Sequence, residues 1–329
     1  MIFYVTSRKH AYTQAVVLLY HRPDLLKWFR LVRYEDVGLL RGVAAGVVIW
    51  TDMDRLSHAE LEDAARLADE LAPRTGLTQL NHPTRSLQRF ALLRRLHDAC
   101  GNAFNVYRPD ALGADIRYPV FIRDEVGALY EEPPLLHDRA ALDDALATLA
   151  DRKLSRPMVV EMVGSAGADG HFRKFAAFRI GDTIYAQHCA MSTSWFVKNA
   201  PETLTPAHLE EIRAYITANP HADAVKQVFD EADTQYGRID YTIDQGRMLV
   251  FEINTNPTVL SDPPTRFATY DARPFADRHV DALLALPGAT APETVPAIDA
   301  AHRRALAGLR RRYEFKRLKI VLGKLFRRR

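Results

Sequence analysis

The chain has 329 residues, 47% of them apolar, and its 44 Lys and Arg against 41 Asp and Glu give a formal net charge of +3. This composition is that of a globular protein with two or three packed domains, and it excludes a disordered chain. The longest apolar run, Gly42 to Trp50, is too short to cross a bilayer.

No secretory signal is visible after Met1, because the short apolar stretch there is followed at once by Arg8 and Lys9. The two cysteines, Cys100 and Cys189, match neither a zinc-ligand spacing nor a disulfide framework. We therefore expect small buried thiols and a reducing, cytoplasmic compartment.

Residues 1–82 are predicted to form an N-terminal α/β domain. Strands are expected over 2–5 and 46–50. The sequence Ser57-His58-Ala59-Glu60 is a capping box that opens a helix ending near residue 72. The acidic cluster 51–54 is expected to form a turn and a helix cap, with contact to a substrate as the alternative.

Two further units follow in the sequence pattern. The first, 83–157, is expected to contain a helix over 84–100, a strand near 118–123 and an amphipathic helix over 138–150. The second, 158–286, is expected to form a larger sheet that a helix from Pro206 to Ala218 interrupts.

Within the larger sheet, residues 170–188 are typical of a hairpin that turns at Gly181-Asp182. Side chains alternate along a strand, so Arg173 and Lys174 point to opposite faces and only one can reach a ligand on a given face. Lys198 is a further cationic candidate. For each of these cations the alternative is a solvated surface charge.

The stretch 238–257 reads as a second hairpin, with Asp240 on its first strand and Glu252 on its second. A two-residue Gln245-Gly246 loop would place Asp240 opposite an apolar side chain, on the wrong face. A three-residue loop over 244–246 places Arg238 opposite Glu252, with Asp240 diagonal to it. We therefore expect the three-residue loop.

In this register one face of the hairpin presents Asp240, Glu252 and Asn254 together. Magnesium prefers such hard oxygen ligands, usually one or two carboxylates completed by phosphate and water. Arg238 on the same face could neutralise charge that develops on a phosphoryl or acyl group. The alternative is the solvated polar face of an ordinary amphipathic hairpin.

These residues resemble the C-terminal end of an ATP-grasp domain, most closely the D-alanine–D-alanine ligase form. That signature is an Asp on one strand and Glu-x-Asn on the next, here Asp240 and Glu252-Ile253-Asn254. The resemblance covers roughly residues 80–285. It implies an ATP-grasp fold in which a pre-ATP-grasp domain precedes two α+β subdomains that clasp a nucleotide. It also implies that Asp240, Glu252 and Asn254 hold magnesium and that Arg238 stabilises acyl transfer.

The same resemblance names candidate nucleotide-binding residues. Glu161 and Val163, on the strand 158–164, match the positions where adenine meets the hinge. A basic residue of the 170–188 hairpin would reach the phosphates; Arg173 and Lys174 both qualify, and Arg173 is favoured because it opens its strand as the family's arginine does.

The chain departs from the family at the phosphate-binding positions. Arg123 and Arg89 stand where the family carries lysines, and the loop 124–128 has one glycine where the family is glycine-rich. Arginine binds phosphate well where its planar fork fits, so nucleotide binding is retained in this interpretation.

The activity implied is an ATP- and magnesium-dependent ligase, with manganese as a substitute metal. It would join a small-molecule or peptide carboxylate to an amine or thiol through an acyl phosphate. Two alternatives remain open: a nucleotide-binding module without catalysis, which the arginine departures favour, and an ATP-grasp kinase.

Residues 287–329 are predicted to be a linker and a basic amphipathic helix. From His302 onward there are twelve Lys and Arg and one Glu, which leaves a net charge of −8 for the rest of the chain. Apolar residues recur at helical spacing at 318, 321, 322 and 325. Packing on the protein itself is the first reading, a membrane or protein partner the second, and nucleic acid the least favoured. The sequence carries no signal for the oligomeric state.

Overall fold

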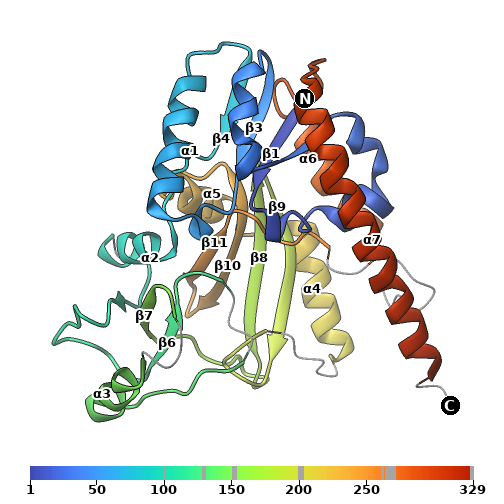
Figure 1. Cartoon of the computed structure of the whole chain (residues 1–329). Helices are drawn as coiled ribbons and strands as arrows, with labels where there is room; N and C mark the ends of the chain where they lie inside the picture. Colours follow the sequence, from blue (N-terminus) through green and yellow to red (C-terminus); the bar gives the residue numbers. More distant parts are fainter. Residues whose placement is uncertain are drawn as a thin grey trace.

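The structure is a computed structural model of the chain, and it describes residues 1–99, 101–127, 131–149, 154–198, 204–260, 263 and 272–326. Three β-sheets with helices packed around them make up the molecule (Figure 1). The mixed α/β architecture predicted from the sequence is confirmed. Among the described residues, no helix has the length and apolar character needed to cross a membrane.

The N-terminal unit is a four-stranded parallel sheet in the order β2-β1-β3-β4. Its strands are β1 (Ile2–Thr6), β2 (Phe29–Arg33), β3 (Gly46–Trp50) and β4 (Leu77–Leu80). Helix α1 (His58–Leu71) begins at the predicted capping box, in which Ser57 and Glu60 cap each other. Shorter helical turns cover Arg8–His10, Val17–His21, Pro23–Lys27, Tyr34–Gly42 and Met53–Arg55.

The middle unit is a small antiparallel sheet in the order β5-β7-β6, flanked by two helices. Its elements are α2 (Arg89–Asp98), β5 (Val106–Tyr107), β6 (Val120–Asp124), α3 (Arg139–Ala147) and β7 (Pro157–Glu161). Strand β7 had been expected in the larger sheet. It pairs with β5 and β6 instead, because both of its faces are apolar and bury Val159 on one side and Val160 on the other within this unit.

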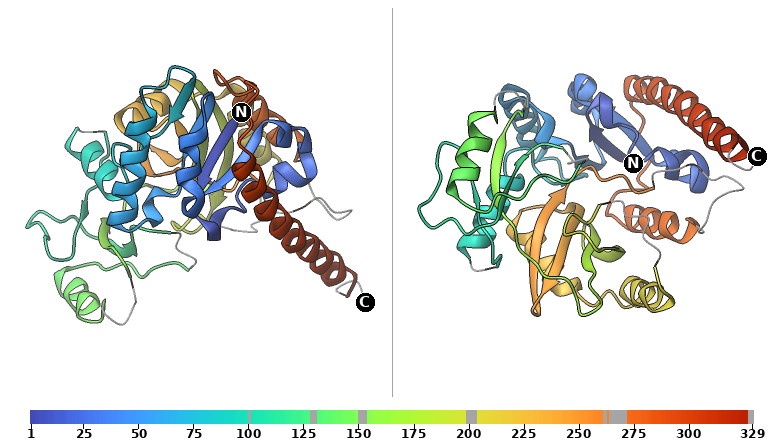
Figure 2. Two further views of the ribbon diagram at one scale, coloured as in Figure 1. Left: turned by 45° about the horizontal axis from the view of Figure 1, so that its top comes forward. Right: turned by 90° about the horizontal axis from the view of Figure 1, so that it is seen from below.

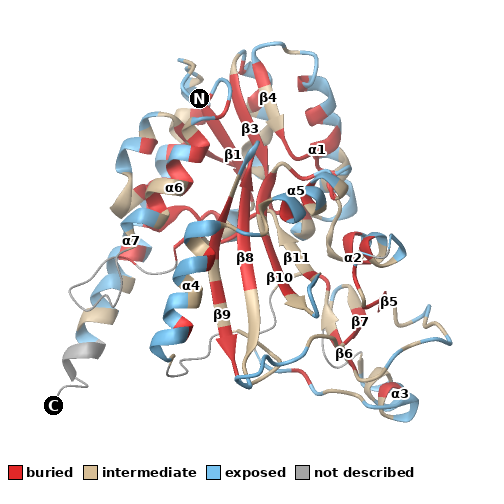
Figure 3. Cartoon of the chain, turned by 180° about the vertical axis from the view of Figure 1, so that it is seen from behind, coloured by how far each residue is buried: buried red, intermediate tan, exposed pale blue. Residues whose placement is uncertain are grey.

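The larger sheet is antiparallel, in the order β11-β10-β8-β9. It consists of β8 (Phe172–Ile180), β9 (Thr183–Ser192), β10 (Tyr236–Asp244) and β11 (Arg247–Asn254). The predicted turn at Gly181-Asp182 joins β8 to β9, and the predicted helix α4 (Pro206–Ala218) is present. Helix α5 (Ala222–Glu231), which was not predicted, joins α4 on one face of the sheet (Figure 3).

Two C-terminal helices, α6 (Arg273–Leu284) and α7 (Pro296–Phe326), complete the described chain. The first half of α7 packs beside the N-terminal sheet, while its second half extends outward as an arm in the left view of Figure 2. One apolar core joins the N-terminal and larger sheets, and Tyr4, Phe178 and Val280 are among its fully buried members. The amide of Asn81 strengthens this junction, because it donates to Trp50 O and accepts from Tyr236 N–H.

Candidate active site

The β10–β11 hairpin turns through two residues, not the three predicted. Gln245 (φ 48°) and Gly246 (φ 77°) both have positive φ, as a type I′ turn requires. The register then shifts by one residue between Asp240 and Tyr241, where β11 carries an extra residue. This bulge places Asp240 directly opposite Glu252. The predicted polar face is therefore present, but a two-residue turn and a bulge produce it in place of a three-residue loop.

Asp240 is buried at the centre of this face. Its carboxylate accepts a hydrogen bond from Arg238 Nε at 3.0 Å and lies 3.7 Å from Lys174 Nζ. Burial alone would raise the pKa of Asp240, but Arg238 and Lys174 outweigh it and the pKa falls below its ordinary value. The carboxylate is therefore ionised, as a metal ligand must be.

Opposite Asp240, Glu252 is paired with two arginines of the middle unit. Arg89 bonds its carboxylate directly, and Arg123 lies 3.9 Å from the same oxygen. Both arginines also donate to Gly127 O at 3.2 Å, so they tie the loop 124–127 to the hairpin. Burial lowers the pKa of Arg89 to about 10, and burial together with Arg89 lowers that of Arg123.

Lys174, and not Arg173, lies on the face that carries Asp240. Arg173 also borders the apolar cavity, but its guanidinium is held by Glu211 of α4 and by Asp169, at 2.6 and 2.9 Å. The geometry therefore reverses the preference for Arg173 that the sequence suggested. Lys198 belongs to the same positive region as Lys174, because burial, then Lys174 and Arg123, lower its pKa.

Asp169, His171 and His208 form a separate cluster whose ligand atoms lie close enough together for a metal ion. Both oxygens of Asp169 are already bonded to Arg173, at 3.1 and 2.9 Å. His208 Nε2 bonds the same carboxylate at 3.0 Å, while its Nδ1 accepts from Thr205 N–H. A fixed guanidinium at the centre makes this a salt-bridged cluster and leaves no place for a cation.

Glu161 is buried and its carboxylate is fully used inside the protein. It accepts hydrogen bonds from Asn105 N–H, Tyr107 Oη and two nitrogens of Arg117, at 2.7–3.0 Å. The side chain therefore holds the β5–β7 edge together and has no acceptor oxygen left over for adenine. Val163, two residues farther on, lines a cavity beside it.

Two cavities meet at Glu252. The apolar cavity lies between the middle unit and the larger sheet; its walls include Phe104, Met158, Val160, Val163, Trp195 and Phe251. Arg123, Lys174 and Asp240 lie along the same cavity. The polar cavity adjoins the N-terminal unit and is lined by Asp52, Asp54, Arg89, Arg238, Asn254 and Asn256. A planar ring in the first and a charged group in the second would both touch the hairpin.

One further residue of the site was not singled out from the sequence, and a second, Asp54, belongs to the acidic cluster 51–54 for which contact with a substrate was only the alternative. His188 stands opposite Ala176, which in turn pairs with Asp240, so it extends the same row; burial and Arg238 lower its pKa to about 4. Asp54 lines the polar cavity, and no described residue pairs with its carboxylate. Strand parity, applied across three strands, could have found His188. The position of Asp54 in the polar cavity agrees with the alternative given for the 51–54 cluster, contact with a substrate.

The donor set of the hairpin fits a hard divalent cation. Asp240 and Glu252 supply carboxylate oxygens, and Asn254 supplies an amide oxygen that accepts from Asn256 N–H at 2.8 Å. Four cations, Lys174, Arg89, Arg123 and Arg238, stand beside these two carboxylates. The surplus of positive charge suits a polyphosphate that arrives with its metal.

Comparison with known proteins gives structural likenesses only, since no family model and no curated protein matches the chain. The chain is similar to D-alanine–D-alanine ligase from Bacillus anthracis complexed with ATP, at 11% identity and a TM-score of 0.47, over 94% of this chain and 98% of that one. It is similar to VanG D-Ala:D-Ser ligase from Enterococcus faecalis at 11% identity and a TM-score of 0.48, over the same shares.

A third likeness is to the RimK domain protein ATP-grasp from Sphaerobacter thermophilus. It has 16% identity and a TM-score of 0.45, over 86% of this chain and 96% of that one. At this level of similarity, the function has to be argued from the residues of the chain itself.

Proposed function

We propose that the chain is an ATP-grasp ligase that uses Mg-ATP to join a carboxylate to an amine or thiol. One observation carries this proposal. The polar face of the β10–β11 hairpin meets the arginines of the middle unit at the point where the two cavities join. A polar metal-type face, clustered arginines and an adjoining apolar slot are what a magnesium-bound nucleotide needs.

In this proposal the adenine ring occupies the apolar cavity, and its phosphates run toward Lys174 and Arg123. Asp240, Glu252 and Asn254 would hold magnesium, which when bound neutralises charge on the phosphoryl group in transfer. Binding then requires Arg89 to release Glu252 and turn toward the phosphates. Arginine in place of lysine offers a planar fork there, able to contact two phosphate oxygens at once.

The polar cavity would receive the second substrate. Its carboxylate takes the terminal phosphoryl group, with release of ADP, and the amine or thiol then displaces phosphate from the acyl carbon and loses its proton. Arg238, which borders the polar cavity and bonds Asp240, would stabilise negative charge on the acyl oxygen. Positioning and charge neutralisation supply the catalysis, so no separate nucleophilic residue is required.

The test is release of ADP and phosphate from Mg-ATP with a panel of carboxylates and amines or thiols. Wild type should turn over with at least one pair, and Asp240→Ala and Glu252→Ala should each abolish that turnover. Wild type that binds Mg-ATP but releases no ADP with any pair would point to a non-catalytic module. Transfer of phosphate to a hydroxyl acceptor, seen by mass spectrometry, would point to a kinase.

A further inference from the structure

The outer half of α7 carries three large apolar side chains that nothing in the described chain covers. Phe315, Leu318 and Leu322 are 60%, 53% and 43% exposed. At 3.6 residues per turn they fall within an arc of about 60°, and we call them the outer stripe. Among the described residues, one other large apolar side chain is comparably exposed, Leu209 on α4.

The outer stripe faces away from the surface that anchors the helix. Ala305, Leu309 and Tyr313 are buried and pack into the main core. Tyr313 lies on the side of the helix roughly opposite Phe315 and Leu322. The C-terminal half of the helix extends outward (Figure 1), so the stripe is held away from the protein by a base that is buried in the main core.

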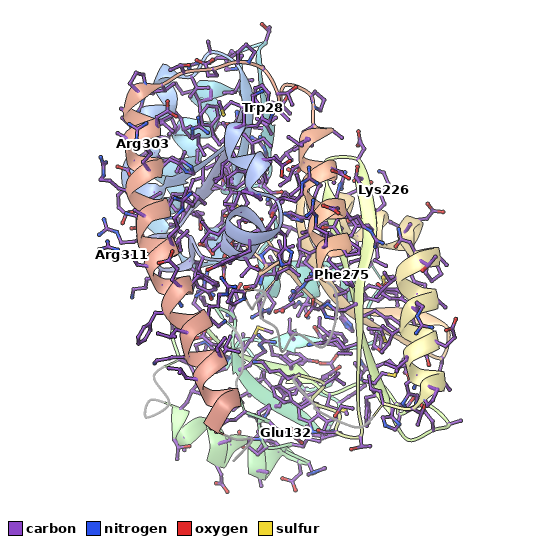
Figure 4. The ribbon with its side chains drawn as sticks, turned by 90° about the vertical axis from the view of Figure 1, so that its right-hand side faces the viewer. Trp28, Glu132, Lys226, Phe275, Arg303 and Arg311 are labelled. Atoms are coloured by element: carbon purple, nitrogen blue, oxygen red, sulfur yellow. The ribbon has the colours of Figure 1, made fainter. Side chains whose placement is uncertain are left out.

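Basic side chains flank the outer stripe. Arg311 and Lys319 are exposed on the same side of the helix, and Figure 4 shows Arg303 and Arg311 along its outer edge. The Lys319 ammonium lies 4.7 Å from the Phe315 ring centre, so a charge sits directly beside the apolar surface. From His302 onward the chain carries twelve Lys and Arg against one Glu, while the rest of it is net negative.

We propose that the outer half of α7 docks on an anionic lipid bilayer, with the outer stripe inserted at the headgroup level and the flanking cations on lipid phosphates. Apolar residues lined by Lys and Arg are the pattern of an interfacial helix. A second copy of the chain fits less well, because two such stripes would bring Arg311 and Lys319 against like charges. Nucleic acid would use the cations but leaves the three apolar side chains without a role.

The test is co-sedimentation of the full chain with vesicles of phosphatidylcholine alone or mixed with phosphatidylglycerol. Wild type should bind the mixed vesicles and not the neutral ones, and added salt should weaken that binding. The triple variant Phe315→Ser, Leu318→Ser, Leu322→Ser should bind at least about tenfold more weakly. Removing two cations, with Arg311→Gln and Lys319→Gln, should cost about fivefold for each one.

Leu209→Ser, on α4, is the matched control and should bind as wild type does. None of these substitutions touches the buried base of α7, so we expect every variant to fold. Thermal melting checks this. The proposal fails if wild type ignores the mixed vesicles or if the triple variant binds them unchanged. A concentration-dependent dimer that the triple variant loses would assign the stripe to a second copy. RNA binding that needs the cations but not the stripe, without vesicle binding, would assign it to nucleic acid.

Discussion

The buried carboxylate of Glu161 accepts four hydrogen bonds. We therefore expect this residue to contribute mainly to the stability of the fold. In Glu161→Gln, one acceptor oxygen becomes an NH2 group that faces N–H donors, and the charge opposite Arg117 is lost. We expect the free energy of unfolding to fall by about 2 kcal/mol, because buried N–H donors are left without an acceptor.

Urea denaturation checks this prediction, with the exposed Glu131→Gln in the same unit as the control. A direct role for Glu161 in binding adenine predicts the opposite pattern. In that case the affinity for ATP would fall while the midpoint of unfolding stayed where it is in wild type.

Asp54 presents a partly buried carboxylate to the polar cavity without a partner among the described residues. Burial raises its pKa above the ordinary value, so the ionised form is held at a cost in the free protein. If the second substrate carries an ammonium group, Asp54→Asn should raise the KM for that substrate at least about tenfold. The same change should slightly raise the melting temperature, because it removes an unpaired buried charge.

Steady-state kinetics and thermal melting together test this prediction, with Asp63→Asn on the exposed surface of α1 as the control. A variant whose melting temperature drops, or whose KM is unchanged for every amine-bearing substrate, would contradict the role given to Asp54.

At the scale of elements, the β10–β11 turn sets the register that brings Asp240 to Glu252. Both central residues have positive φ, which glycine adopts freely and glutamine does not. No atom lies near the position of a Cβ on Gly246, so Gly246→Ala isolates the backbone cost. We expect it to destabilise the protein by about 1 kcal/mol, and Gln245→Asn to stabilise it by a few tenths to about 1 kcal/mol.

The urea midpoints of the two variants, compared with that of wild type, show whether residues 245 and 246 form a two-residue turn. A three-residue loop would place different demands on residue 245. Gln245→Asn with no gain in stability, together with Gly246→Ala with no loss, would therefore rule out the two-residue turn.

The same hairpin marks what the sequence can predict and what it cannot. The alternation of apolar and polar residues correctly grouped Asp240, Glu252 and Asn254 on one face. A register shifted by one residue would move the buried apolar side chains to the opposite face, which is unfavourable. The predicted loop length was wrong. A two-residue turn followed by a one-residue bulge brings the same side chains to one face as a three-residue loop does, and the alternation of the sequence cannot tell the two apart. Helix α4 was predictable from Thr205 as N-cap and Pro206 at its start.

Ion pairs between separate elements were beyond sequence reasoning for a different reason. Lys174 and Arg173 are adjacent and chemically alike, and only the docking of α4 decides that Glu211 takes Arg173. The pairing of Arg89 with Glu252 joins the middle unit to the larger sheet, so it depends on how the two units pack together and not on any local pattern.

At the scale of the whole molecule, buried histidines make the fold sensitive to mild acid. Burial lowers the pKa of His279 to about 3, and burial together with Arg30 lowers that of His302 to about 4, from an ordinary value of 6.5. The pKa of His188, in the site, is also lowered by burial, to about 4. The unfolded chain binds protons at these positions below pH 6.5 while the folded chain does not. Stability is therefore complete above pH 6.5 and falls as the pH drops toward 4.

His302 offers a clean test, because its Nδ1 accepts from Leu31 N–H at 3.0 Å and ties α7 to β2. Asparagine at this position keeps an acceptor oxygen but cannot titrate. His302→Asn should therefore cut the loss of unfolding free energy between pH 6.5 and pH 5.5 by about 1 kcal/mol, one fully shifted histidine being worth about 1.4 kcal/mol per pH unit. Denaturation at a series of pH values measures it, with the exposed His58→Asn as the control. An unchanged slope in His302→Asn would mean that His302 is already protonated in the folded chain, and that the contact between α7 and β2 is not what acid weakens.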